Sequence, residues 1–458
     1  MYDVAIVGSG FSAIAESIHF LRLLPPSASI VVVGDDPGFG RGTAYRTELH
    51  VHRLNVAAGR MSIFPDEPDD FCLWLREQNR DVPQDGFASR DDFGRYLRDR
   101  LAGLLRNREN RPTLHFIKAK AKACDVCTPE RAVFQLDNGR TLEAANVVLC
   151  LGVGNAELPV EPSLGEEDER VVRNPWRLGW LSHVGATDRI CILGSGLTMV
   201  DQVLALRAHG HRGQIEVLSR RGLVAHPHLE SKIEPVAPDL PPSREISHIL
   251  AALRQTARTS GSWRGVMDGL RPLTQGLWQD LSRAQRSRFL RHGLAWWNIH
   301  RHRLAPEVSR QLETLLQDGT LNVHKGFLQT IEPDGEHLSL SFRPRGAAQS
   351  TTLNADWVIN CTGMERAGIA HSPLLRQMRD DGLIASADLG LGICVDRDSR
   401  VLNAEKEHQP NLFAVGALTA GQFWEITAVP DIRVQAKKVA EAISHRIHAS
   451  QALEETAA

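Results

Sequence analysis

The sequence predicts an α/β protein with two doubly wound β-α-β units. Two glycine-rich turns carry this prediction. Gly8-Ser9-Gly10-Phe11-Ser12-Ala13 follows the apolar run Val4–Val7, and Gly194-Ser195-Gly196-Leu197-Thr198-Met199 follows the run Ile190–Leu193. In each, the first glycine permits a tight turn, the second lets the backbone approach a pyrophosphate, and the helix that follows offers free N–H groups to the anion. Two such turns in strand–turn–helix context indicate two dinucleotide sites far more strongly than one would.

Composition limits the classes of partner. The 458 residues suffice for two or three domains, and 42% hydrophobic with 24% charged residues is ordinary for a globular protein. The net charge of −2, without a Lys/Arg-rich block, argues against a nucleic acid or an anionic membrane as a partner. No apolar run reaches about 18 residues, which argues against a membrane span.

Sequence features also bear on the compartment. The first predicted strand begins at Tyr2 and leaves no room for a signal peptide. Seven cysteines, an odd number, lie mainly in apolar strand-like segments, as expected of a reduced, cytoplasmic protein. We therefore expect a cytoplasmic protein whose oligomeric state, a homo-oligomer included, stays open.

The first unit begins with strand 4–7, helix 13–24 and strand 30–33. The second of these strands ends in Gly34-Asp35-Asp36, where a carboxylate commonly binds the ribose diol of the dinucleotide. Gly34 occupies the place where the acid is often found, so Asp35 or Asp36 is the candidate; the alternative is a solvated turn. The glycine-rich loop Gly38–Tyr45 can wrap a cofactor closely, and strand 147–151 returns to the first sheet and ends at Gly152.

The second unit differs from the first in charge. After a linker at 153–188 it begins at Arg189, and its strand Ile215–Ser219 ends in Arg220-Arg221-Gly222. An arginine there can form charge-assisted hydrogen bonds to a 2′-phosphate, although a solvated basic turn is the alternative. The acidic first turn and the basic second turn therefore predict FAD at the first site and NADPH at the second.

The remaining segments complete a split arrangement. Residues 240–318 are helical and rich in Trp, 321–353 form strands, and 356–363 is a strand ending at Gly363 with the same form as 147–152. We predict that this strand returns to the first sheet, so that the NADPH-binding domain is inserted into a split FAD-binding domain. The predicted boundaries are 1–152 (FAD domain, first part), 153–188 (linker), 189–355 (NADPH domain with helical insertion 240–318), 356–448 (FAD domain, second part) and 449–458 (disordered tail).

Several motifs together resemble a known family. The chain is similar over nearly its whole length to the bacterial NAD(P)/FAD-binding flavoproteins, relatives of the flavin-containing and N-hydroxylating monooxygenases. The resemblance lies in Gly8-Ser9-Gly10, Gly40–Tyr45, Leu54-Asn55-Val56, Arg60-Met61-Ser62, Phe64-Pro65-Asp66, Gly194–Asp201, Ser219–Gly222 and Phe423–Pro430. One departure is Gly34, which displaces the expected acid to Asp35.

This resemblance implies an activity. It implies an FAD-dependent, NADPH-using monooxygenase that acts with O₂ on a small-molecule substrate, N-hydroxylating a small amine or amino acid through a C4a-hydroperoxyflavin. Asn55 is the implied catalytic residue, a donor to the peroxide or to retained NADP⁺; a turn asparagine is the alternative. Arg60 and Glu425 contact the substrate or the flavin, or form ordinary ion pairs.

The predicted cofactor-binding residues come from both units and from the C-terminal segment. They are Gly8, Ser9, Gly10, Phe11, Ser12, Asp35, Asp36, Arg41, Gly42, Tyr45, Arg60, Met61, Gly152, Gly194, Ser195, Gly196, Leu197, Thr198, Arg220, Arg221, Gly363, Gly416, Trp424, Glu425 and Ile426. No metal is predicted: His226 and His228 have no Cys or acidic cluster beside them at ligand spacing.

Two other functions compete with the monooxygenase. One is an NAD(P)H-dependent flavoprotein oxidoreductase that passes electrons to a quinone, a disulfide or another acceptor. Cys124-Asp125-Val126-Cys127 is a CxxC, but its β alternation favours two thiols on a strand over a redox pair at a helix start. The other is a non-catalytic flavin-binding sensor, against which the Arg220-Arg221 pair argues because a sensor needs no second nucleotide site.

Overall fold

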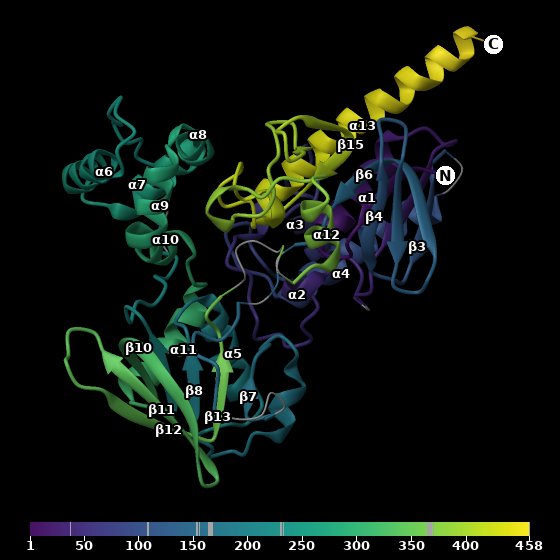
Figure 1. Ribbon diagram of the computed structural model, residues 1–458. Coiled ribbons are helices and arrows are strands. Elements are labelled where there is room, and N and C mark those ends of the chain that lie inside the picture. The colour runs from purple at the N-terminus through teal and green to yellow at the C-terminus, as the bar shows by residue number, and fades with distance from the viewer. Residues whose placement is uncertain are drawn as a thin grey trace. The chain divides into compact units, whose positions relative to one another are not determined.

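The computed structural model describes residues 1–36, 38–107, 110–152, 154, 156–163, 168–229, 231, 233–363, 369 and 371–457 (Figure 1). The chain divides into two compact units. The first comprises Met1–Glu48, Val56–Gly154 and Arg366–Ala458, and the second comprises Leu49–Asn55 and Asn155–Glu365.

A mainly parallel sheet forms the centre of the first unit. Its strand order is β14-β15-β6-β1-β2-β3, and β4 and β5 form an antiparallel extension that pairs with β6. The apolar runs fix the centre of this sheet, because a strand covered on both faces must be apolar throughout. The strands are β1 (Tyr2–Val7), β2 (Ser29–Val33), β3 (Thr113–Ile117), β4 (Ala121–Cys127), β5 (Ala132–Leu136), β6 (Thr141–Leu149), β14 (Arg400–Leu402) and β15 (His408–Ala414).

Helices pack on this sheet and on one another. Helix α1 follows the first glycine turn directly, and α13 packs along it (Figure 1). Helix α4 packs against both α1 and α2. The helices of this unit are α1 (Phe11–Leu23), α2 (Gly42–Tyr45), α3 (Asp70–Glu77), α4 (Arg90–Arg106), α12 (Pro373–Asp380) and α13 (Val429–Ala457), with short 3₁₀ segments at Ala58–Arg60, Asp388–Gly390 and Ala417–Thr419.

The second unit repeats the parallel core of the first. Its strand order is β12-β11-β10-β9-β8-β13-β7, so β8 lies between β9 and β13 as β1 lies between β2 and β6. The strands are β7 (Val171–Val172), β8 (Ile190–Leu193), β9 (Ile215–Ser219), β10 (Leu321–Asp334), β11 (His337–Pro344), β12 (Thr351–Ala355) and β13 (Trp357–Asn360). The long strand β10 pairs parallel with β9 through Lys325 and antiparallel with β11 from Gly326 onward.

Helices of the second unit fall into two groups. Helix α5 (Leu197–Ala208) follows the second glycine turn, and α11 (Pro306–Gln317) leads into β10. Between β9 and α11 the chain forms the predicted helical insertion, whose helices gather in one cluster in Figure 1. They are α6 (Ile246–Ser260), α7 (Trp263–Leu270), α8 (Thr274–Asp280), α9 (Arg283–Arg288) and α10 (Leu294–Arg301), with a π-helical segment at Phe289–Gly293.

Three predicted boundaries need correction. Strand β13 does not return to the first sheet: Val358 pairs with Cys191 of β8, so 356–363 belongs to the second unit. The predicted linker 153–188 contributes β7, which pairs with β13. The segment Leu49–Asn55, predicted within the FAD domain, also belongs to the second unit. An apolar strand ending in glycine fits either parallel sheet, and the pattern alone does not say which sheet it joins.

The C-terminal prediction is also wrong. Helix α13 continues to Ala457 instead of ending at His448 before a disordered tail. The residues beyond His448 include Ala, Gln, Leu and Glu, all strong helix formers, and they contain no glycine or proline that would end the helix. In the part of the chain that the structure describes, no helix is both long and apolar enough to span a bilayer.

Candidate functional site

The first glycine turn has the geometry of an anion site. Gly8 has φ +132°, and its N–H donates to the carbonyl oxygen of Val33 at 2.8 Å. A Cβ at Gly8 would lie 2.3 Å from the carbonyl oxygen of Cys150, so this position accepts only glycine without a backbone shift. Helix α1 starts after Gly10 without an acidic residue in its first turn. Its first N–H groups therefore present positive potential that an anion can neutralise.

The second glycine-rich loop packs against the first turn. The N–H of Gly40 donates to the carbonyl oxygen of Ser9 at 2.8 Å, and a Cβ at Gly42 would lie 3.4 Å from Cα of Gly10. Arg41 lies between these two glycines in the chain. Its Nε is buried and has no hydrogen-bond partner among the described residues. A buried guanidinium donor without a partner is costly in a protein interior, so this atom is suited to a bound anion such as a diphosphate.

The structure separates the two candidate ribose acids. Asp36 lies at the turn: its N–H donates to Oγ of Ser9 at 3.2 Å, and its Oδ1 accepts from the N–H of Gly38 at 2.9 Å. Asp35 is exposed and pairs with Nζ of Lys120 at 3.1 Å. Asp36 is therefore better placed than Asp35 for a hydroxyl pair of a nucleotide that follows the turn.

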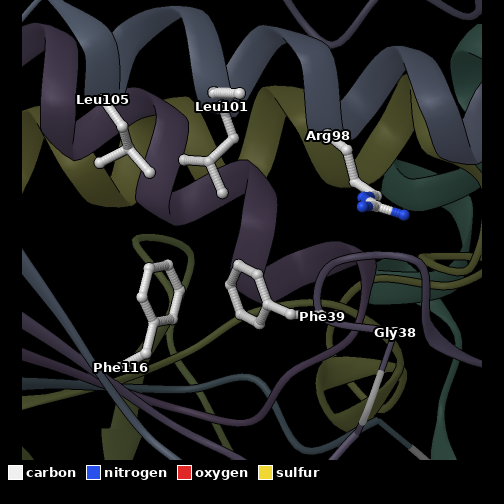
Figure 2. Close-up of a pocket in the computed structure, with 7 residues that line it drawn as sticks. Gly38, Phe39, Arg98, Leu101, Leu105 and Phe116 are labelled. Atoms are coloured by element: carbon white, nitrogen blue, oxygen red, sulfur yellow. The ribbon is translucent and has the colours of Figure 1, made fainter.

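A pocket of about 370 Å³ lies beside Gly38, between α4 and strand β3 (Figure 2). The rings of Phe39 and Phe116 meet edge to face at 4.8 Å between centroids, and Figure 2 shows them facing Leu101 and Leu105 of α4. Phe116 remains 49% exposed although it is a large apolar side chain. The exposed Arg98 lies at one end of the pocket, so the lining combines two aromatic rings with one cation.

Two predicted aromatic residues support the turn from the side. The rings of Phe11 and Tyr45 lie 6.0 Å apart, and Tyr45 lies 4.8 Å from the ring of Phe93 on α4. Burial raises the pKa of the Tyr45 hydroxyl to about 12, so this group stays protonated at neutral pH. Tyr45 thus joins the loop Gly38–Tyr45 to α4, and Phe11 at the start of α1 lies against both Tyr45 and Phe93.

The C-terminal segment meets the same turn. Gly416 has φ +84°, and a Cβ there would lie 2.4 Å from Oγ of Ser12 in the first turn of α1. Further along, Glu425 has φ +64°, a conformation that costs a residue with a side chain free energy and often marks a functional site. Ile426 is 2% exposed and packs in the core, while the neighbouring Trp424 is half-buried.

Met61 and Arg60 lie at the end of a 3₁₀ turn, and their environments differ. Met61 is 2% exposed, which gives it a packing role, whereas Arg60 is exposed. The first unit thus brings Gly8, Ser9, Gly10, Ser12, Asp36, Arg41, Gly42 and Gly416 together around the N-terminus of α1.

The second glycine turn repeats the first. Gly194 has φ +103°, its N–H donates to the carbonyl oxygen of Leu218 at 2.8 Å, and a Cβ there would lie 2.2 Å from the carbonyl oxygen of Cys361. Helix α5 starts after Gly196 with Leu197 and Thr198, without an acid in its first turn. A Cβ at Gly196 would meet no atom of the chain within 4 Å, so its surface is open to a ligand.

A serine network joins this turn to the basic turn. Oγ of Ser195 donates to the carbonyl oxygen of Leu223 at 2.6 Å and lies 2.9 Å from Oγ of Ser219. Oγ of Ser219 in turn accepts from the N–H of Gly222 at 3.0 Å. Of the two arginines between them, Arg220 is exposed, while Arg221 donates to the carbonyl oxygen of Arg291 at 3.4 Å. Arg220 is thus the better candidate for a phosphate.

Gly152 and Gly363 occupy equivalent places in the two units. Each lies two residues after a cysteine, Cys150 or Cys361, whose carbonyl oxygen lies against the first glycine of the turn in the same unit. A Cβ at Gly152 or Gly363 would meet nothing within 4 Å. Because β13 pairs with β8, Gly363 belongs with Gly194 and not with the FAD-domain residues among which we predicted it.

Asn55 lies in the second unit, together with the segment Leu49–Asn55. Its backbone carbonyl oxygen is 3.0 Å from Nε2 of His228, the second histidine of the His-Pro-His sequence after the basic turn. From the sequence we interpret His226 and His228 as a wall beside the nicotinamide or a plain loop in preference to a metal pair. This interpretation does not predict the contact with Asn55, because nothing in the pattern relates residues 173 positions apart. Among the described residues, no group of three or more His, Cys, Asp or Glu side chains is arranged to hold a metal ion.

The CxxC cysteines lie on strand β4, as the β alternation predicts, and both are reduced. Their backbone is fixed by the side chain of Gln377 on α12, whose Oε1 accepts from the N–H of Cys124 at 2.8 Å. The Cys124 thiol donates to the carbonyl oxygen of Val126 at 3.4 Å. The neighbouring Cys124 lowers the pKa of Cys127, but neither cysteine lies at a helix N-terminus.

The sequence of this chain is similar to those of known proteins. Residues 5–154 match the model of a family described as FAD-NAD(P)-binding. An uncharacterised protein of Mycobacterium tuberculosis is 22% identical over 525 aligned residues, covering 96% of this chain and 95% of its own length.

Solved structures extend the likeness to the whole chain. The ornithine N-hydroxylase of Kutzneria sp. 744 superposes with a TM-score of 0.67 at 16% identity, covering 97% of this chain and 99% of its own. The L-lysine 6-monooxygenase of Pseudomonas syringae gives 0.66 at 18% identity with the same coverage. The bacillithiol disulfide reductase of Bacillus cereus gives 0.55 at 15% identity, again with 97% and 99% coverage. The chain therefore shares its overall fold with these three proteins.

Proposed function

We propose that this protein is an FAD-dependent, NADPH-using monooxygenase that N-hydroxylates a small amine or amino acid. One observation carries the proposal. Two glycine turns with the same backbone geometry lie in two separate, mainly parallel sheets. The strand that follows the second turn, β9, ends in paired arginines, whereas the strand that follows the first, β2, ends in paired aspartates. Two dinucleotides of different phosphate content account for this difference.

The residues of the first unit fit FAD. The N-terminus of α1 and the unpartnered Nε of Arg41 would hold its diphosphate, and Asp36 would hold the adenosine ribose. The pocket beside Gly38 offers the rings of Phe39 and Phe116 to the adenine (Figure 2). When bound, FAD supplies the redox chemistry of the reaction: it accepts a hydride and, once reduced, activates O₂.

The residues of the second unit fit NADPH. The N-terminus of α5, next to the open surface of Gly196, would hold its diphosphate. Arg220 would bind the 2′-phosphate by charge-assisted hydrogen bonds, which distinguish NADPH from NADH. Asn55 would donate a hydrogen bond from its side-chain amide to the bound nicotinamide nucleotide.

The fold neighbours support the amine as substrate class. The structures with TM-scores of 0.67 and 0.66 are named for the N-hydroxylation of ornithine and the monooxygenation of lysine, respectively, whereas a disulfide reductase gives 0.55. The position of Cys124 and Cys127 on a strand does not favour a dithiol reductase.

The proposal is tested on the FAD-loaded protein with NADPH and a panel of ornithine, lysine, cadaverine and other small amines. Hydroxylamine product, NADPH consumption and hydrogen peroxide are measured in the same reaction. A substrate that yields about one hydroxylamine per NADPH establishes the function. If NADPH consumption yields only peroxide with every amine and the protein rapidly reduces a quinone or disulfide, the monooxygenase proposal is wrong and the protein is an NAD(P)H-dependent oxidoreductase.

A further inference from the structure

The segment Leu49–Asn55 is fixed to the second unit at three points. Nε2 of His52, which is fully buried, lies 3.0 Å from the carbonyl oxygen of Asp201 in helix α5. Nε of Arg53 pairs with Glu307 of α11 at 3.4 Å. The third point is the contact of His228 with the carbonyl oxygen of Asn55 at 3.0 Å. The segment therefore runs beside the helix whose N-terminus we assign to the NADPH diphosphate.

Hydrogen bonding on both sides of the ring fixes the tautomer of His228. A carbonyl oxygen can only accept, so Nε2 must carry the proton that it donates to Asn55. On the other side, both terminal nitrogens of the Arg264 guanidinium lie 3.4 Å from Nδ1. A guanidinium can only donate, so Nδ1 must accept and the ring must be neutral. Burial lowers the pKa of His228 to about 4, in agreement with a neutral ring.

A half-buried carboxylate, that of Asp268, holds Arg264 in place. Nε of Arg264 donates to Oδ2 of Asp268 at 2.6 Å, and Arg303, whose side chain is 8% exposed, donates to Oδ1 of the same carboxylate at 3.0 Å. Burial by itself raises the pKa of Asp268, but the two guanidinium groups outweigh burial and hold it below its usual range. Asp268, Arg264 and His228 thus form a chain of directed hydrogen bonds that ends on Asn55.

We propose that His228 is a positioning residue for Asn55. By fixing the backbone carbonyl of Asn55, the chain Asp268–Arg264–His228 fixes the direction of the Asn55 side-chain amide. Helix α7 of the helical insertion supplies Arg264 and Asp268, so the insertion has a function beyond its own packing. The consequence for NADP⁺ binding rests on the proposed function, in which the Asn55 amide contacts the nicotinamide nucleotide.

Three variants of the full-length FAD-loaded protein test the positioning. His228→Leu removes the donor to Asn55, whereas His228→Gln keeps an N–H near the place of Nε2. His226→Leu is the matched control, because His226 is an exposed histidine whose ring lies tilted against that of His300, at 4.9 Å between centroids. Hydrogen–deuterium exchange of the peptide containing residues 49–57 reports the order of the segment without any reference to activity.

We expect His228→Leu to raise exchange in this peptide about tenfold, the effect of losing one hydrogen bond of about 1.4 kcal/mol. Exchange in His228→Gln and His226→Leu should stay within about twofold of wild type. Unchanged exchange in His228→Leu, or an equal rise in His226→Leu, would overturn the positioning role.

A double-mutant cycle tests the consequence for the nucleotide. We expect His228→Leu to weaken NADP⁺ binding about tenfold, and to weaken it no further when Asn55 is already alanine, because the two changes remove the same interaction. Additive losses would mean that His228 acts on NADP⁺ by another route and would overturn the inference. Increased exchange without any loss of NADP⁺ affinity would keep the positioning role and exclude the proposed contact of Asn55 with the nucleotide.

Discussion

Charge at single residues distinguishes two turns whose backbones are otherwise alike. Asp36 lies at the first turn, where its N–H is bonded to Ser9, and Arg220 is exposed after the strand beside the second. A diol needs an acceptor and a phosphate needs donors, so we propose that one side chain at each turn selects the dinucleotide bound there. These residues were predicted from the sequence, because each directly follows an apolar strand.

Arg220→Ala should raise the KM for NADPH about 10- to 100-fold, the cost of a charge-assisted hydrogen bond of about 1.5–3 kcal/mol. The KM for NADH should change little, since NADH has no 2′-phosphate. Steady-state flavin reduction with each nucleotide measures both values. Equal changes for the two nucleotides would exclude a 2′-phosphate contact at Arg220.

The pH dependence of stability should reveal the neutral state of His228. Its pKa falls from 6.5 to about 4 on folding, so between these values the unfolded chain binds more protons than the folded one. The contribution of His228 to the free energy of unfolding is therefore fully present above pH 6.5. It is lost as the pH falls toward 4, by up to about 3 kcal/mol. His228→Gln should lose less stability than wild type on acidification from pH 7 to pH 5.

Urea unfolding followed by tryptophan fluorescence measures this difference, since most of the tryptophans lie in the second unit. His226→Gln, the same change at an exposed histidine of the same loop, is the matched control. An identical acid loss in wild type and His228→Gln would show that His228 does not titrate differently in the folded protein.

Strand, turn and helix work as one element at each glycine turn. In both units the first glycine contacts the carbonyl oxygen of the cysteine that follows the neighbouring parallel strand: Cys150 for Gly8 and Cys361 for Gly194. A side chain at either glycine would displace that strand end and shift the N-terminus of the helix. The loss of anion binding should then stay within the altered unit.

Gly194→Ala should weaken NADP⁺ binding about 10-fold or more and leave the FAD content unchanged, whereas Gly8→Ala should lower the FAD content. Gly276→Ala is the control: it lies in helix α8, where a Cβ would meet nothing within 4 Å. Flavin absorbance per protein and NADP⁺ titration measure the two sites. Loss of FAD in Gly194→Ala would mean that the second turn does not serve a separate nucleotide.

The pocket between α4 and β3 offers a test of the FAD assignment at a distance from the glycine turn. Phe116→Ala removes one of its two aromatic rings and should weaken FAD binding about fivefold, the value of an aromatic contact of about 1 kcal/mol. Phe327→Ala, an exposed phenylalanine of the second unit, is the matched control. Rebinding of FAD to the flavin-free protein measures the effect. Equal affinities in the two variants would show that the adenine does not bind in this pocket.

At the scale of the whole molecule, the cysteines contribute packing. The structure holds all seven as free thiols, and burial raises the pKa of the Cys150, Cys191 and Cys361 thiols. Thiols of this kind are protonated and unreactive at neutral pH. The candidate pair, Cys124 and Cys127, lies on strand β4 and not at a helix N-terminus, which favours electron transfer through the cofactors over a protein dithiol.

The double variant Cys124→Ser, Cys127→Ser should therefore keep its FAD content and at least half of its NADPH-dependent turnover. Single Ser variants at the two positions separate packing losses from redox losses. Abolished turnover in a variant that retains FAD would restore the dithiol oxidoreductase.

Local patterns were sufficient to predict much of this protein. The apolar runs Val4–Val7 and Ile190–Leu193, each followed by a glycine turn, predicted β1, β8 and the helices after them, since strand, turn and helix depend on neighbours in the chain. The acidic residues after β2 and the basic residues after β9 can likewise be read from the local sequence, and the different nucleotides that we assign to the two sites stay a prediction.

Only the tertiary structure decided which sheet a strand joins and which distant residues meet. Strand β13 fits either sheet by its sequence but pairs with β8, and Asn55 lies in the second unit because His52, Arg53 and His228 hold its segment there. The choice between Asp35 and Asp36 likewise depended on the fold, which gives Lys120 to the first and Ser9 to the second. Strand pairing and side-chain contacts between distant residues depend on how the whole chain packs. A local sequence pattern describes only one of the two partners in such a contact.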